Sequence, residues 1–136
     1  MRRRAVVLAS TAVALVLTGC PKRTAIWVVR GSTADRLEFG IADRRDGARA
    51  VQIDVLRVSS CDSAPYGPTG AAWLLSRVTE ATPPPTRVTY GREPLGFRSD
   101  QGPQPLVPGC YDAMVTGTGR LRFEIETQGA VTEFRR

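Results

Sequence analysis

The chain has 136 residues, a formal net charge of +6 and no histidine. The lack of histidine excludes Ser-His-Asp and Cys-His catalysis and histidine-based metal sites. Half of the net charge comes from three arginines at positions 2–4, and the other charges of both signs are interspersed, as in residues 43–46 (DRRD). No basic stripe that would follow a phosphate backbone is visible, so the composition does not indicate a nucleic-acid partner.

The N-terminal segment has the composition of a secretory signal peptide. After the arginines, the apolar run from Ala5 to Leu17 is shorter than the roughly 20 residues of a membrane-spanning helix. A basic head followed by an apolar stretch of this length is typical of a signal-peptide helix, which is removed on export.

The cleavage region, Leu17-Thr18-Gly19-Cys20, resembles the lipobox of bacterial lipoproteins. The resemblance implies that a signal peptidase cuts before Cys20, whose thiol carries a diacylglyceryl group with fatty acids such as palmitate. Two acyl chains are enough for stable anchoring, whereas one is marginal. An ordinary signal peptide with a chance cysteine is the alternative.

This resemblance divides the chain into residues 1–19 (signal peptide), 20–24 (lipidated cysteine and short tether) and 25–136 (one β-sandwich domain). The expected location is the cell envelope, lipid-anchored on the periplasmic or extracellular side of a membrane. Removal of the signal peptide leaves 117 residues with a side-chain charge of +3, a size typical of one domain.

The remaining cysteines, Cys61 and Cys110, form an even pair in an oxidising compartment and predict a disulfide. The alternative is a pair of free redox thiols, although the chain has no Cys-x-x-Cys motif.

Short segments with β-type patterning follow one another along the domain. Strands are expected at residues 25–29, 37–42, 51–55, 72–76, 87–90, 111–115, 121–126 and 131–134. Asp46-Gly47 is a hairpin signal, and the break in alternation at Leu56-Arg57-Val58 predicts a bulge or a strand end.

Two proline-rich segments interrupt these strands. Residues 83–85 (PPP) predict a linker or a sheet edge. Residues 91–108 are expected to form a loop that packs against the domain through Leu95 and Phe97. Residues 59–71 form a second expected loop.

The pattern predicts an all-β fold, an antiparallel β-sandwich of about seven strands. Residues 106–111 (LVPGCY) resemble the tyrosine corner of immunoglobulin-like and fibronectin-III-like sandwiches. The resemblance implies that Tyr111 closes a crossover between the sheets by bonding to backbone a few residues upstream, with Leu106 filling the core beneath. A small up-and-down or Greek-key barrel is the alternative fold.

The function that these observations favour is a non-enzymatic module that binds, assists or supports a partner in the envelope, such as a protein or a cell-wall polymer. The two long loops are the expected binding region, because loops at one end of a sandwich commonly carry binding. Its candidate side chains are the aromatic residues Tyr66, Trp73, Tyr90 and Phe97, for which core or loop packing is the alternative role.

The alternative function is an envelope hydrolase or other enzyme that uses loop carboxylates. Asp62, Glu93, Asp100 and Asp112 lie in or near the loops, but their spacing indicates no catalytic geometry. No cofactor and no metal site are expected, since the Asp-x-Asp-x-Asp spacing of a calcium loop is missing.

Overall fold

The computed structural model describes residues 23–63, 70–80, 83–116 and 119–134. The predicted signal-peptide helix, Cys20, most of the tether and Tyr66 lie outside these residues. Among the described residues, there is no helix with the length and apolar character needed to span a membrane.

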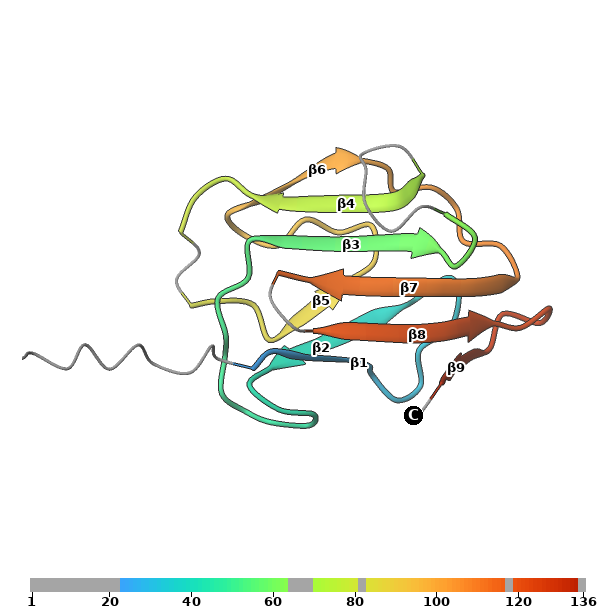
Figure 1. Cartoon of the computed structure of the whole chain (residues 1–136), viewed down its shortest axis with the longest axis horizontal. Helices are drawn as coiled ribbons and strands as arrows, with labels where there is room; N and C mark the ends of the chain where they lie inside the picture. The colour runs from blue at the N-terminus through green and yellow to red at the C-terminus, as the bar shows by residue number, and fades with distance from the viewer. Residues whose placement is uncertain (1–22, 64–69, 81–82, 117–118, 135–136) are drawn as a thin grey trace, which may run out of the picture.

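Two antiparallel sheets pack face to face, and together they contain nine strands in the described residues. The strands are β1 (Ala25–Val28), β2 (Glu38–Ala42), β3 (Val55–Ser60), β4 (Ala71–Arg77), β5 (Arg87–Thr89), β6 (Phe97–Gln101), β7 (Gly109–Val115), β8 (Arg120–Ile125) and β9 (Val131–Glu133). One sheet has the order β1-β2-β5 and the other β6-β4-β3-β7-β8-β9 (Figure 1). The prediction of an all-β sandwich is confirmed, and the barrel alternative is wrong.

The order of the strands resembles that of an immunoglobulin-type sandwich with three additional strands. In such folds strands A, B and E lie in one sheet and strands C, F and G in the other. Here β1, β2 and β5 take the first three places, and β3, β7 and β8 take the other three. Strand β4 lies beside β3 as an additional C′ strand does. Strands β6 and β9 extend the larger sheet at its two edges, which raises the total from the expected seven to nine.

The core lies between the sheets and is filled by the inward-facing residues of every long strand. Phe39 of the smaller sheet meets Phe123 of the larger one edge to face, with ring centroids 5.8 Å apart. Tyr111 stacks on the same Phe123 at 5.6 Å. Such aromatic pairs contribute about 1 kcal/mol each beyond the burial of apolar area. Along β8, exposed residues alternate strictly with buried ones, so one face of this strand lies in the core and the other in solvent.

The tyrosine corner forms as the sequence motif implies. The Tyr111 hydroxyl donates to the Val107 carbonyl at 2.9 Å and accepts from the Val107 amide at 3.1 Å. Leu106 packs against the core. One expectation needs correction, because the segment before Tyr111 connects β6 and β7 within the larger sheet instead of crossing between sheets. The reason is the added strand β6, which follows β5 and joins the larger sheet first.

Residues 51–55 do not form the predicted strand, since β3 begins only at Val55. Ile53 is fully buried, but its segment carries the chain from the smaller sheet to the larger one.

Asp46 has the positive φ of 54° that a tight turn requires, and the chain reverses there. However, β2 and β3 belong to different sheets, so the turn is not a hairpin between paired strands. The predicted irregularity near Val58 is a bulge between Val58 and Ser59.

The expected loop at 91–108 contains a strand, β6, which pairs with the edge of β4. Phe97 is buried in the core as predicted. Leu95 is 84% exposed, so the expectation that it packs against the domain is wrong. Prolines at 94, 103 and 105 flank β6 without entering it, which is why the segment reads as a loop in sequence.

The disulfide between Cys61 and Cys110 is present, with a Cα–Cα distance of 5.4 Å. It joins neighbouring strands of one sheet, because Cys61 directly follows β3 and Cys110 lies in β7. The Cys61 amide also donates to the Cys110 carbonyl at 3.0 Å. Unlike the disulfide of antibody domains, this bridge lies outside the core and secures the start of the loop that begins at Cys61.

The sandwich has two distinct ends, here called the base and the apex. The base holds Thr24, whose carbonyl oxygen is 3.0 Å from the point where a Cβ on Gly119 would lie. It also holds Thr116, whose hydroxyl accepts from the Val55 amide at 2.8 Å. The apex holds the disulfide and lies at the right of Figure 1, opposite the point where the chain enters β1. Seven residues of β7 separate the two ends by about 20 Å.

The hydroxyl of Tyr111 should contribute measurably to stability. Tyr111→Phe removes both bonds to Val107 while keeping the ring, and we expect it to cost about 1–2 kcal/mol of unfolding free energy in urea titrations. Tyr111→Ala, which also removes the stacking on Phe123, should cost about 3–5 kcal/mol. A Tyr111→Phe variant as stable as the unmodified protein would contradict the assignment of the corner.

The disulfide closes a loop with a sequence separation of 49 residues. The chain-entropy model for a loop of this length predicts that Cys61→Ala/Cys110→Ala lowers the unfolding free energy by about 4 kcal/mol. Chemical denaturation of the protein with and without reductant provides an independent comparison. A loss below about 1 kcal/mol in both measurements would show that the bridge is dispensable for stability.

Candidate functional site

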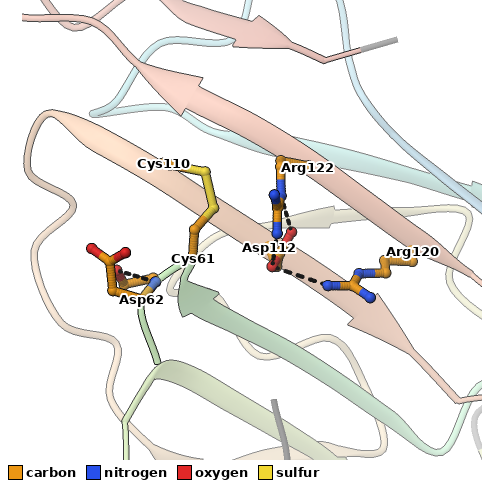
Figure 2. Close-up of polar contacts among 7 residues, drawn as sticks. Cys61, Asp62, Cys110, Asp112, Arg120 and Arg122 are labelled. Carbon is orange, nitrogen blue, oxygen red and sulfur yellow. Dashed lines mark hydrogen bonds and ion pairs between the residues drawn. A yellow bond between two sulfur atoms is a disulfide. The ribbon is translucent and has the colours of Figure 1, made fainter. Parts of the chain in front are cut away.

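The outer face of β7 and β8 carries a cluster of charged side chains centred on Asp112. Alternation along β7 puts Tyr111 in the core and therefore turns Asp112 to the outer face. Asp112 lies directly opposite Arg122 of β8 in the strand register. Arg120 is two residues from Arg122 on the same face, so it approaches Asp112 diagonally. Figure 2 shows Asp112 between the two guanidinium groups.

The contacts of Asp112 hold both arginines in defined positions. Arg122 donates through Nε to Oδ1 at 2.9 Å and through Nη2 to Oδ2 at 3.0 Å, which is a bidentate pair. Arg120 donates through Nη2 to Oδ2 at 3.3 Å. The hydrogen bonds from Arg122 lower the pKa of Asp112 against the opposing effect of burial, and those from Arg120 lower it further. The Asp112 carboxylate therefore stays ionised at neutral pH.

A second charged pair joins the loop after β2 to the last strand. Arg45 donates to both carboxylate oxygens of Glu133, with Nη2 3.1 Å from Oε2. Hydrogen bonding to Glu133 raises the pKa of Arg45. Glu133 Oε2 also accepts from the Val28 amide at 3.3 Å. Since β1 is the edge of the smaller sheet, this contact caps one of its outward-facing amides.

Arg45 and Glu133 line two grooves on the side of the molecule where β1 approaches β8 and β9. The edge groove, with a volume of about 820 Å³, follows residues 27–32 of β1 and the turn after it. The basal groove, with a volume of about 550 Å³, has Ile26 and Leu121 in its floor. Its charged walls are Arg45, Glu133 and the Asp112 cluster, and Phe134 completes it. Volumes of this size suit a small ligand or a headgroup.

The aromatic residues predicted for binding do not form a surface cluster among the described residues. Trp73 and Phe97 are buried in the core. Tyr90 packs edge to face on Trp73 at 5.2 Å, and its hydroxyl donates to the Gln104 carbonyl at 2.7 Å. Burial raises the pKa of Tyr90 to about 12. Trp73, Phe97 and Tyr90 therefore pack within the domain, which is the alternative considered for them above. Tyr66 lies outside the described residues.

Only part of the predicted binding loop at residues 91–108 lies near the other predicted loop, residues 59–71. Residues 102–108 lie near the start of β4, where the Gln104 amide donates to the Ala72 carbonyl at 2.8 Å. This places them at the apex with the segment that begins at Cys61. Residues 91–96 instead lead to the base, where the Val78 amide donates to the Gly96 carbonyl at 2.8 Å.

Three of the four loop carboxylates considered for catalysis, those of Glu93, Asp100 and Asp112, have separate hydrogen-bond partners. Glu93 accepts from the Ser99 amide at 2.8 Å, and Asp100 accepts from Ser76 and Arg98. The hydrogen bond from Ser76 lowers the pKa of Asp100. Asp62 is exposed beside the disulfide and lies away from Asp112 in Figure 2. Within the described ranges, no three histidine, cysteine or carboxylate side chains gather in a way that would hold a metal ion.

The groove residues Arg45, Glu133 and Phe134 carry no motif that sequence reasoning can find. The Arg45–Glu133 pair joins residues 88 positions apart, so only the fold brings them together. Arg120, Asp112 and Arg122 do lie in recognisable strands, and correct pairing of β7 with β8 would have revealed their cluster.

The chain matches no protein-family model, and no curated protein or solved structure is significantly similar to it. The strand order and the tyrosine corner thus rest on this chain's own residues.

The lowered pKa of Asp112 predicts a pH-dependent contribution to stability. Because the unfolded aspartate titrates near pH 3.9, its stabilising effect is complete above about pH 5 and is lost as pH falls through the lower folded pKa. We expect Asp112→Asn to cost about 1–3 kcal/mol at pH 7 and the difference to shrink below pH 4.

Urea titrations across this pH range measure the effect. Asp62→Asn, a change at an exposed aspartate, is the matched control and should cost less than about 0.5 kcal/mol at pH 7. An Asp112→Asn cost that stays constant down to pH 2 would mean that ionisation of Asp112 does not stabilise the fold.

Proposed function

We propose that this chain is a lipid-anchored, non-enzymatic module of the bacterial cell envelope that binds, assists or supports an envelope partner. The observation that carries the proposal is the position of the chain's entry into the sandwich. Thr24, four residues after Cys20, packs at the base near Gly119. An acylated Cys20 would therefore hold the base toward the membrane.

The opposite end has the features of a presented binding surface. The disulfide holds the start of the segment after β3 against β7, and the tyrosine corner secures residues 102–108. Both devices stabilise irregular backbone at the apex, about 20 Å from the base. Rigid support of loops is what binding surfaces on sandwiches use, and it favours an envelope protein or a cell-wall polymer as the partner.

The enzymatic alternative has less support from the geometry. General acid–base chemistry needs a carboxylate within reach of a substrate and with a pKa near the working pH. Asp112 and Asp100 instead have lowered pKa values and are held by arginines and a serine. We therefore favour the non-enzymatic function.

Mass spectrometry of the protein from its native membrane tests the anchor directly. The expected mature chain begins at an acylated Cys20, and the Cys20→Ser variant should lose the acyl mass. Cys61→Ala/Cys110→Ala is the control, since it removes the other cysteines and should leave acylation intact. A native membrane-bound protein whose Cys20 carries no acyl mass would overturn the proposal.

A further inference from the structure

We propose that the basal groove docks the sandwich onto the phosphate headgroups of anionic phospholipids beside its own lipid anchor. The inference rests on the proposed acylation of Cys20 and extends it, because it names the surface that meets the bilayer. The groups that would contact the headgroups are the guanidinium groups of Arg45, Arg120 and Arg122 and the exposed ring of Phe134.

The position of the groove is the first argument. Ile26 in its floor is two residues beyond Thr24, and Arg120 in its wall directly follows Gly119, on which Thr24 packs. Four residues of extended chain reach at most about 14 Å, so an acylated Cys20 must stay close to Thr24. The end of the groove at Ile26 and Arg120 is therefore the part that lies nearest the headgroups.

The orientation of the arginines is the second argument. Asp112 binds Arg122 and Arg120, and Glu133 binds Arg45, so each guanidinium is already held at the groove. A guanidinium has five N–H donors, and Arg122 uses only its Nε and Nη2 atoms on Asp112 (Figure 2). The remaining donors suit a phosphate, which arginine binds through paired hydrogen bonds. Three arginines against two carboxylates leave the groove with a net charge of +1.

The exposed apolar residues are the third argument. Phe134 is 46% exposed and lines the groove. Val78 and Leu95 are also exposed at the base, but they lie outside the groove, beside β4 and β6 at the far edge of the larger sheet. Arginines beside exposed aromatic and aliphatic side chains are typical of surfaces that rest in the headgroup region. An acidic glycan would match the charge of the groove but would not account for the exposed Phe134 ring in its lining.

Fluorine NMR of the processed protein in nanodiscs provides the test. All phenylalanines are replaced by 4-fluorophenylalanine, and Phe134→Leu identifies the Phe134 signal. Phe39, Phe97 and Phe123 are buried and serve as internal references for an intact fold. The discs contain either phosphatidylcholine alone or an equal mixture with phosphatidylglycerol, and both carry a nitroxide headgroup lipid. We expect selective broadening of the Phe134 signal in the mixed discs and its loss in high salt.

Arg120→Gln and Arg98→Gln form a matched pair of variants. Each arginine donates through Nη2 to an aspartate at 3.3 Å, and their side chains are 53% and 68% exposed. Arg98 lies on β6, at the opposite edge of the larger sheet. Arg120→Gln should remove most of the broadening, whereas Arg98→Gln should retain it.

The outcomes separate failure of docking from failure of the anchor. An intact mass without the acyl group overturns the anchor and this docking mode together. If the chain is acylated, any of three results would overturn the docking proposal and leave the anchor intact. These are equal broadening of the Phe134 signal in neutral and mixed discs, no broadening in either, or an equal effect of the two variants. A Phe134 shift caused by an oligogalacturonate, without lipid broadening, would assign the groove to an acidic cell-wall polymer and overturn the lipid proposal.

Discussion

The two-residue alternation at the start of β7 is the constraint on which the rest of the molecule depends. Three consecutive residues there have three different roles. Cys110 faces out and binds Cys61, Tyr111 faces in and closes the corner, and Asp112 faces out and holds two arginines. A shift of register by one residue would put the tyrosine in solvent and the aspartate in the core. Disulfide, core and charged cluster are therefore specified together by one strand.

The same strand links the two ends of the sandwich. Its first two residues, Gly109 and Cys110, lie at the apex, and its last residue, Val115, lies at the base, where the Val115 amide donates to the Gly119 carbonyl. The apex is stabilised by a covalent bridge and by the bonds of a buried hydroxyl. The base is stabilised by backbone pairing and by ion pairs that reach the surface. This division accords with the proposed orientation, in which the base lies toward the membrane and the apex away from it.

Much of the fold follows from local patterning in the sequence, because alternation and turn residues report on each strand's own surroundings. Leu121, Phe123 and Ile125 reveal β8 in this way, and the motif ending in Tyr111 reveals the corner. Residues 51–55 mislead, since Ile53 is buried in a connection between sheets and not in a strand. Strand β6 escapes detection because prolines surround it.

The candidate site was less accessible to sequence reasoning than the fold. In a sequence, an aromatic residue that binds a partner looks the same as one that fills a core. Trp73 and Phe97 fill the core. The groove depends on pairs distant in sequence, above all Arg45 with Glu133. Such pairs become predictable only once the order of the strands is known.

In the proposed orientation, the base meets the membrane and the apex faces away from it. Paramagnetic broadening of backbone amides by nitroxide headgroup lipids tests it most directly, residue by residue, in the acylated protein. We expect strong broadening at Thr24, Arg45 and Arg120 and none at Cys61 or Val107. Broadening at the apex, or equal broadening at both ends, would contradict it.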